Sequence, residues 1–153
     1  MKKISFEWET DRFLLFGFRC VWESFRLAFH LNRALRIRLE RTARDLDCYH
    51  KMLDAQACYP RYAYFDKAKE QHWSLIENRA RIQRSVRDRL FEESEYQVYL
   101  IPERKEIDCF LKVAQAEAHV GRAILKRITP ITGLHMAVEI DAERLKSKRN
   151  LIF

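Results

Sequence analysis

The stretch FLLFGFRCVWESFRLAFHLNRALRIRLERT, residues 13–42, decides the fold because its hydrophobic period changes twice. Residues 13–20 form a nearly continuous apolar and aromatic run, which predicts a buried strand. Residues 21–35 repeat with the helical period, and the predicted core face holds Trp22, Phe25, Ala28, Phe29 and Leu35, with Leu27 and Leu31 at its edge. Residues 35–42 alternate apolar and charged, as in a strand with one wet face. The stretch therefore predicts a β–α–β unit.

The rest of the chain predicts more strands than helices. Two strands joined by a bend are expected over 61–81, two more at 96–101 and 107–113, a helix at 117–128 and a last strand at 134–140. Residues 45–60 read as a connection, and 82–95 as either a short helix or a loop. We therefore predict one α+β domain over residues 1–153, with a mainly antiparallel sheet, two helices packed on one face and β–α–β units at both ends. The apolar ending predicts that Leu151, Ile152 and Phe153 dock on the body.

Composition indicates a globular protein of a reducing compartment. The chain has 153 residues, of which 48% are hydrophobic and 33% charged, enough for one stable core. Acidic residues interrupt the start of the chain before residues 13–18, so neither a signal peptide nor a membrane span is expected. We therefore predict a cytoplasmic protein whose four cysteines, Cys20, Cys48, Cys58 and Cys109, are reduced thiols. The net charge of +7 permits an anionic partner.

The residues that carry catalytic or metal chemistry are present, but not in recognisable arrangements. Cys48, His50 and Cys58 are the best metal cluster, and they lack an obvious fourth ligand for structural zinc. With three glycines in all, the chain has no Gly-rich phosphate loop, and it has no nucleophile elbow. We predict no catalytic residue, no metal, no cofactor and no small-molecule substrate.

Protein contact and nucleic-acid binding are the two functions that the residues favour. Arg36 and Arg38 are expected on one strand face with Arg33 and Arg41 nearby, and Tyr62, Tyr64 and Trp73 are expected as stacking surfaces if they face solvent. A sheet with helices on one side also leaves a broad face for a partner, and the chain has 10 Phe, 6 Tyr and 3 Trp. We predict a non-catalytic protein-interaction or self-associating module. The alternative is an RNA-binding accessory protein that uses Arg33, Arg36, Arg38 and Arg41.

A charged island interrupts the apolar pattern in LIPERKEIDCFLKV, residues 100–113. Pro102 cannot donate a ladder hydrogen bond, which suits the end of a strand, and the charged bend lies between two apolar runs. The island is therefore predicted to be a hairpin connection. Asp108 lies just inside the second strand, and we expect its carboxylate to accept hydrogen bonds from the backbone of the loop.

The same island resembles the signature of a known family. Ile101-Pro102-Glu103, followed after three residues by Ile107-Asp108, resembles the IPExxxVDY family of small bacterial proteins with no assigned activity. RLAFHLNRAL, ERTARDLD and LKSKRNLIF resemble the family too, so the resemblance covers most of the chain and is weakest over 50–95. Ile107 stands where the family name has valine, and Cys109 where it has tyrosine, which removes a phenol. The resemblance implies no catalytic activity, and an association with ribonuclease III and pyruvate kinase genes.

Overall fold

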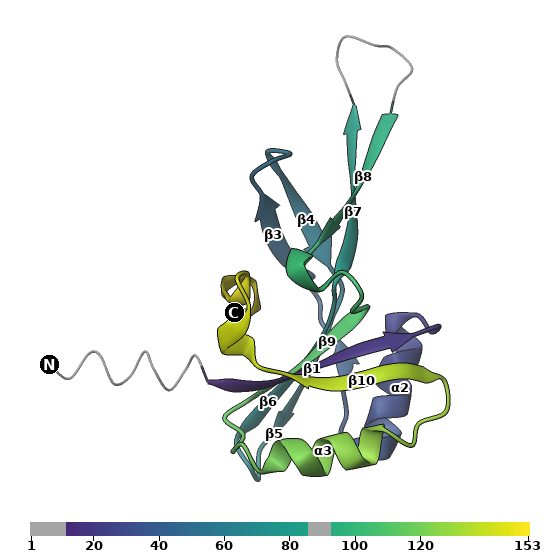
Figure 1. Cartoon of the computed structure of the whole chain (residues 1–153), viewed down its shortest axis with the longest axis vertical. Helices are drawn as coiled ribbons and strands as arrows, with labels where there is room; N and C mark the ends of the chain where they lie inside the picture. Colours follow the sequence, from purple (N-terminus) through teal and green to yellow (C-terminus); the bar gives the residue numbers. More distant parts are fainter. Residues whose placement is uncertain (1–11, 86–92) are drawn as a thin grey trace, which may run out of the picture.

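The computed structural model describes residues 12–85 and 93–153, and it has the predicted α+β class (Figure 1). A six-stranded sheet runs in the order β10-β1-β9-β6-β5-β2, and two two-stranded sheets, β3-β4 and β7-β8, accompany it. Every described strand pair is antiparallel. The main-sheet strands are β1 (Phe13–Cys20), β2 (Glu40–Arg41), β5 (Arg61–Asp66), β6 (Gln71–Glu77), β9 (Cys109–Ala114) and β10 (Leu134–Ile140). Among the described residues no helix is long and apolar enough to cross a membrane.

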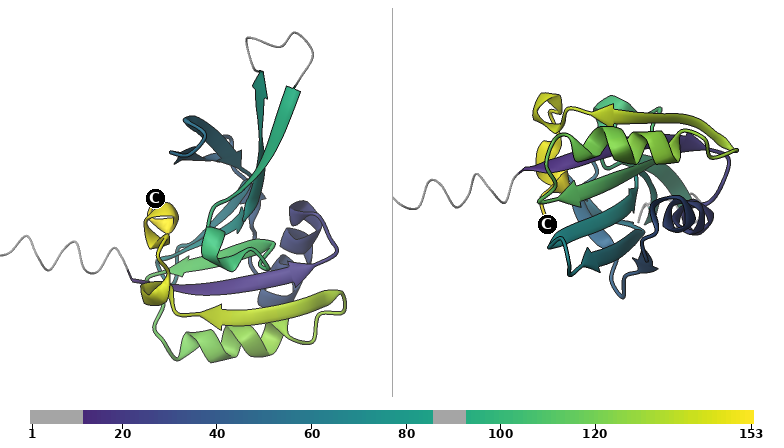
Figure 2. Two further views of the ribbon diagram at one scale, coloured as in Figure 1. Left: turned by 45° about the horizontal axis from the view of Figure 1, so that its top comes forward. Right: turned by 90° about the horizontal axis from the view of Figure 1, so that it is seen from below.

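Both helices cover one face of the main sheet, as predicted (Figure 2). α2 (Ser24–Leu35) and α3 (Val120–Ile128) share a core with inward side chains of β1, β6 and β9. We call this the helix-side core, and its members include Phe16, Leu31, Leu111 and Ile124. Because β1 alternates its side chains between the two faces, its apolar run FLLFGF is buried from both sides.

The N-terminal β–α–β unit forms, but its second strand is much shorter than predicted. Only Glu40 and Arg41 pair with β5, although Leu35, Ile37 and Leu39 are buried in the predicted alternation. The side-chain amide of Asn32 takes the place of a neighbouring strand, because it donates to the Leu39 carbonyl at 3.1 Å and accepts from the Leu39 N–H at 2.8 Å. Residues 37–39 are therefore extended but make no backbone pairing with a neighbouring strand that the structure describes.

The C-terminal β–α–β unit has its predicted form. β9 and β10 are both antiparallel to β1, which lies between them, so they run parallel to each other with α3 as the crossover. Gly17 of β1 lies close to two isoleucines, since a Cβ there would lie 2.7 Å from Ile107 Cδ1 and 2.7 Å from Ile140 Cδ1, and one or both side chains would have to shift to admit it. This close approach explains why the aromatic run of β1 contains a glycine.

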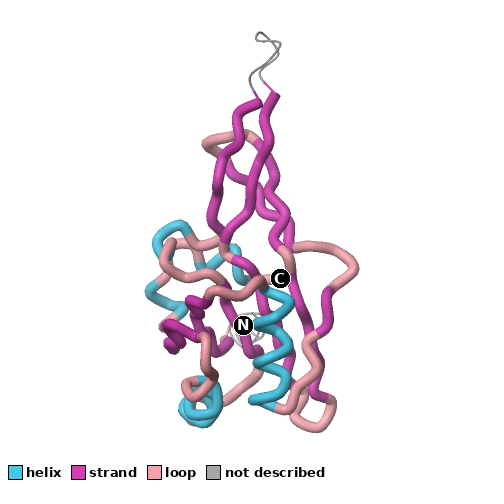
Figure 3. Tube along the Cα trace, turned by 90° about the vertical axis from the view of Figure 1, so that its right-hand side faces the viewer, coloured by secondary structure: helices cyan, strands magenta, loops and turns pink. Residues whose placement is uncertain are grey.

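Two hairpins rise from the main sheet, and the sequence had predicted neither. β3 (Leu46–His50) pairs with β4 (Ala55–Tyr59), in the segment predicted to be a connection. β7 (Arg79–Ser85) pairs with β8 (Glu93–Tyr99). This hairpin takes in the segment 82–95 that was left open as helix or loop, together with the first four residues of the strand predicted at 96–101; residues 86–92 lie outside the described part. β4 packs against β7, and Figures 1 and 3 show the two hairpins projecting together beyond the helices.

The second face of the main sheet is covered, and the expected open face is therefore wrong. Leu15, Ile76 and Phe110 point to this side, where they meet residues of both hairpins, the 100–107 segment and the C-terminal tail. We call this the hairpin-side core; the covering residues are Ala57, Tyr59, Ile82, Val98, Leu100, Ile101, Ile107, Ala142, Leu145 and Leu151. Neither face of the main sheet is therefore open to a partner.

Candidate interaction surface

The island of residues 101–108 is a crossover between two sheets, and the predicted hairpin is wrong. β8 pairs with β7, whereas β9 pairs with β1 and β6 in the middle of the main sheet. The 3-10 turn η1 (Pro102–Arg104) and the turn after it carry the chain from one sheet to the other. β8 ends at Tyr99, three residues before Pro102, which begins η1, and the strand that follows belongs to a different sheet.

Asn78, at the junction of β6 and β7, holds this crossover in place. Its fully buried side chain donates to the carbonyls of Arg104 and Ile107, both at 2.9 Å, and accepts from the Ile101 N–H at 2.8 Å. Its backbone bonds Asp108 and Leu100 at 2.9 and 2.8 Å. Ile101 and Ile107 are themselves fully buried, and the Ile101 N–H and the Ile107 carbonyl bond this amide, while the Ile101 carbonyl and the Ile107 N–H bond the backbone of Arg104.

Asp108 bonds distant segments and not the backbone of its own loop, which corrects the expected role. Its Oδ2 accepts from the Cys20 N–H at 3.0 Å, and its Oδ1 lies 2.9 Å from Arg79 Nη2. The carboxylate thereby joins the end of β1, the start of β7 and the start of β9. The geometry gives Asp108 a structural role.

Glu103 fastens the C-terminal tail to the crossover. Its Oε1 accepts from the Ser147 N–H at 2.8 Å, and its Oε2 lies 2.9 Å from Ser147 Oγ. Asn150 adds a bond to the Leu100 carbonyl at 2.7 Å, and Leu151 is fully buried. The predicted docking of Leu151 is confirmed, whereas Ile152 and Phe153 are 45% and 43% exposed; the Phe153 ring lies beside Arg61 and Lys112.

The four arginines proposed for nucleic acid do not form one strand face. Arg33 lies on α2, Arg36 closes the helix in the left-handed conformation with φ 56°, and Arg38 lies in the extended 37–39 segment; all three are exposed. Arg41 is committed to an ion pair with Asp45 and lies over the Tyr62 ring. The expected aromatic stacking surface is wrong, because Tyr62 and Trp73 are buried beneath the helices and Tyr64 packs against the same core.

The outer side of α2 is the unusual surface of this protein. The sequence placed Phe25 and Phe29 in the core, but both are 57% exposed, and Val21 just before the helix is 74% exposed. The buried side of α2 instead holds Ser24, Leu27, Ala28, Leu31 and Leu35. Lone exposed apolar residues are ordinary, but two exposed phenylalanines one turn apart form a patch.

The apolar patch continues into a basic one along the same side of the helix. Residues spaced by four share a helix side, so Phe25, Phe29 and Arg33 line up, and Arg36 follows at the C-cap, just past the end of the helix. We call these four residues the outer stripe of α2. No ion pair of Arg33 or Arg36 is seen within the described residues, and the stripe itself contains no acidic residue. The exposed side of α2 is therefore apolar near its start and positively charged at its end.

A cleft of about 620 Å³ lies beside this stripe; the three arginines that line it are already paired, and Glu23 and Glu77 line it as well. Phe25 lines it together with Trp22, Arg79 and Asp108. Arg79 pairs with Asp108, Arg81 with Glu95 at 3.3 Å, and Arg41 with Asp45. The cleft thus extends the apolar end of the stripe without offering a free cationic site.

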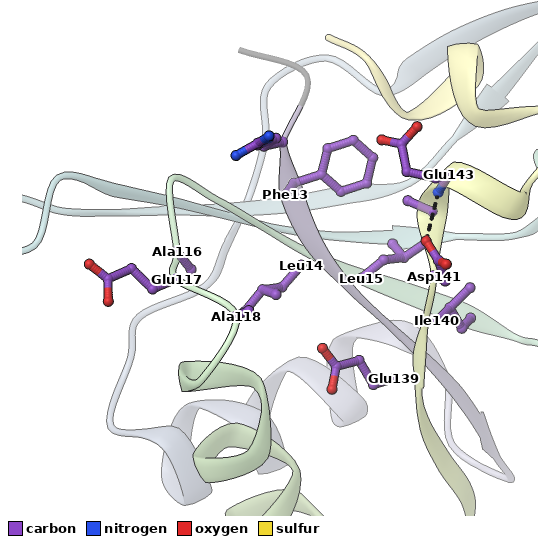
Figure 4. Close-up of a pocket in the computed structure, with 12 residues that line it drawn as sticks. Phe13, Leu14, Leu15, Ala116, Glu117, Ala118, Glu139, Ile140, Asp141 and Glu143 are labelled. Carbon is purple, nitrogen blue, oxygen red and sulfur yellow. Dashed lines mark hydrogen bonds between the residues drawn. The ribbon is translucent and has the colours of Figure 1, made fainter. Parts of the chain in front are cut away.

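A second cavity, of about 810 Å³, lies between the start of β1 and the end of β10 (Figure 4). Its floor is apolar, and Figure 4 shows carboxylates around it, from Glu117, Glu139, Asp141 and Glu143. Asp141 pairs with Arg144 at 3.4 Å and Glu143 with Lys148 at 2.6 Å, while Glu117 contacts His119 at 3.1 Å. Two of the four carboxylates, those of Asp141 and Glu143, therefore already have a cationic partner in the chain itself.

Cys58 and His50, two of the three residues considered as zinc ligands, hydrogen-bond to other side chains. The Cys58 thiol donates to Asp47 Oδ1 at 3.0 Å, which raises its pKa, and His50 Nε2 lies 2.7 Å from the Tyr59 hydroxyl. Within residues 12–85 and 93–153, no three metal-binding side chains gather as a site. Cys109 is buried beneath the helices, and burial raises the pKa of its thiol well above the ordinary value.

Comparison with protein-family models, with curated proteins and with solved structures finds no match to this chain. A function therefore has to be argued from the surface itself. Sequence reasoning missed its key residues in two ways. Asn78 gave no signal beyond a polar residue between two strands, and Phe25 and Phe29 were assigned to the core because hydrophobic periodicity does not say which of two adjacent helix sides is covered.

Proposed function

We propose that this protein is a non-catalytic protein-interaction module that binds through the outer stripe of α2. The observation that carries the proposal is the exposure of Phe25 and Phe29 on a helix whose opposite side is fully packed. Burying the exposed part of each ring against a partner contributes about 1–2 kcal/mol. Aromatic anchors of this kind dominate the binding energy of many protein interfaces.

The charge of the stripe indicates the chemistry of the partner. Arg33 follows the two rings on the same helix side and Arg36 follows at the C-cap, so a complementary segment carries apolar side chains one helical turn apart and carboxylates beyond them. An acidic amphipathic helix of another protein has this pattern. A second copy fits α2 less well, because the stripe offers its own arginines no carboxylate.

Affinity purification from the native cell tests the proposal with a pair of variants. We expect one or more proteins with an acidic amphipathic segment to co-purify with the natural chain and to be lost from the Phe25→Ser plus Phe29→Ser variant. The matched control is Phe65→Ser, which removes an exposed phenylalanine from β5. A synthetic peptide of the recovered segment should then bind the purified protein, and replacing its carboxylates by amides should weaken binding about tenfold.

The same co-purifying proteins from all three samples would contradict the assignment to α2. Binding of the peptide by Phe25→Ser plus Phe29→Ser with unchanged affinity would do so independently of the cell extract.

RNA binding is the second candidate, and the exposed arginines favour it. Arg36 and Arg38 have no ion pair within the described residues, and an exposed phenylalanine ring can stack on a base. A gel-shift series with RNA at increasing salt tests this function. If RNA binds, Arg36→Ala plus Arg38→Ala should lower the slope of log affinity against log salt by about 0.7 for each phosphate that the variant no longer neutralises. Absence of binding at low salt would exclude the RNA function.

We also infer a cytoplasmic location and membership of the IPExxxVDY family. All four cysteines are free, which supports a reducing compartment. The family proposal rests on the sequence resemblance, and two residues of its motif, Glu103 and Asp108, make bonds that fasten the crossover. Fluorescence microscopy of a tagged chain in its native cell tests the location.

A further inference from the structure

The two edges of the main sheet are protected very differently. β2 forms one edge and consists of two charged residues, Glu40 and Arg41. β10 forms the other edge, is seven residues long, and contains no lysine or arginine in a chain that has 29 of them. Natural proteins shorten or charge an exposed edge because its free backbone groups would otherwise pair with another strand. β10 is neither short nor basic, and Glu139 is its one carboxylate (Figure 2).

The hydrogen bonds of β1 show which backbone groups of β10 face outward. The Phe18 carbonyl accepts from the Asp108 N–H at 2.8 Å, so residue 18 faces β9. Its neighbour Gly17 therefore faces β10, where it pairs with Val138. Ala137 and Glu139, which alternate with Val138, direct their N–H and C=O groups away from the sheet. No strand among the described residues takes up these groups.

The order of side chains along β10 suits antiparallel pairing with β10 of a second copy of the chain. In an antiparallel pair of β10 strands centred on Ala137, His135 lies opposite Glu139 of the other copy. Met136 lies opposite Val138, so a polar pair and an apolar pair alternate on both sides of the centre. The shift in pairing between Arg19 and Cys20 falls near Leu134 and leaves Met136–Ile140 regular.

We propose that two copies of this chain pair antiparallel along β10, about a two-fold axis at Ala137, and join their main sheets into one. The contact uses backbone bonds from Ala137 and Glu139 and two His135–Glu139 pairs. This surface is separate from the outer stripe of α2, and the proposal does not depend on the function proposed for that stripe. The net charge of +7 on each copy opposes association, so pairing should tighten as salt screens the repulsion.

Sedimentation equilibrium of the full chain tests the pairing. We expect the mass to rise from 18.5 kDa towards twice that value over a series from about 1 μM to 1 mM protein. Ala137→Pro removes an N–H that points out of the sheet and should raise the dissociation constant by at least about tenfold. Its thermal melt, measured alongside, separates loss of pairing from loss of the fold.

Substitutions that change the charges at His135 and Glu139 test the register of the β10 pairing without introducing a proline. His135→Glu places a carboxylate opposite Glu139 and should weaken pairing, and Glu139→Lys should weaken it as well. Combining the two substitutions restores opposite charges and should restore pairing. A chain that stays monomeric over the whole series would overturn the proposal. A dimer that survives Ala137→Pro and is lost in Phe25→Ser plus Phe29→Ser would overturn it too, and would assign self-association to α2.

Discussion

The crossover of residues 101–108 and the outer side of α2 use their side chains in opposite ways. The crossover is rich in charged residues, yet Glu103 and Asp108 bond Ser147, Cys20 and Arg79 of the same molecule. The outer stripe of α2 is half apolar, yet Phe25 and Phe29 face water. Charged residues are costly to leave without partners inside a fold, whereas exposed rings gain free energy only from a second molecule. The charged crossover therefore stabilises the fold, and the outer side of α2 is the candidate for function.

Replacing the centre of the crossover should have the largest effect on stability. Asn78→Ala leaves the buried Ile101 N–H and the Ile107 carbonyl without their partner, and we expect unfolding free energy to fall by about 3 kcal/mol or more. Chemical denaturation measures the loss. Asn32→Ala is the matched control, since that amide also bonds a backbone but is only partly buried, and it should cost about 1 kcal/mol. Equal losses would show that the crossover does not depend on Asn78.

Asp108→Asn should be the next most damaging change. The amide keeps an acceptor for the Cys20 N–H but loses the ion pair with Arg79, so we expect a loss of about 1 kcal/mol. Thermal melts of Asp108→Asn, Arg79→Met and the double variant measure the coupling. A melt of Asp108→Asn that matches the natural chain would remove the structural role given to this carboxylate.

Glu103→Ala should loosen the tail while leaving the rest of the fold in place. Ser147 loses both of its bonds to the carboxylate, at a cost of about 1 kcal/mol. Hydrogen exchange should therefore accelerate in residues 145–151 and not in β9. Glu106→Ala is the control, because Glu106 lies in the same crossover but pairs with Arg104 and not with the tail. Equal exchange in the two variants would contradict the fastening role.

The outer stripe of α2 should show the smallest effect on stability. Phe25→Ser plus Phe29→Ser should change unfolding free energy by no more than about 0.5 kcal/mol per site, because both rings are exposed. Leu31→Ala, on the buried side of the same helix, should cost about 3 kcal/mol. Denaturant titrations compare them. A large loss from the phenylalanine pair would mean that the rings stabilise the chain itself, and the comparison between the two regions would fail.

Much of the fold could be predicted from local pattern. The first strand and the last were placed at their observed bounds, Phe13–Cys20 and Leu134–Ile140, because each has a distinctive apolar pattern bounded by a change of period. The 61–81 strand pair was also correct. Errors arose where the strand partner lay elsewhere: Leu39 bonds a helix side chain in place of a strand, and β8 belongs to a different sheet from β9.

The sequence by itself determined the α+β class, the two crossover helices and the strands whose two faces are buried, because hydrophobic period reports burial directly. The tertiary structure alone decided which polar groups meet and which apolar groups stay exposed. Asn78 reaches across 23 residues to Ile101 and Asp108 across 88 to Cys20, distances at which no sequence pattern reports contact. The exposure of Phe25 and Phe29 was likewise set by how α2 lies on the sheet, since a small rotation of the helix would have buried them.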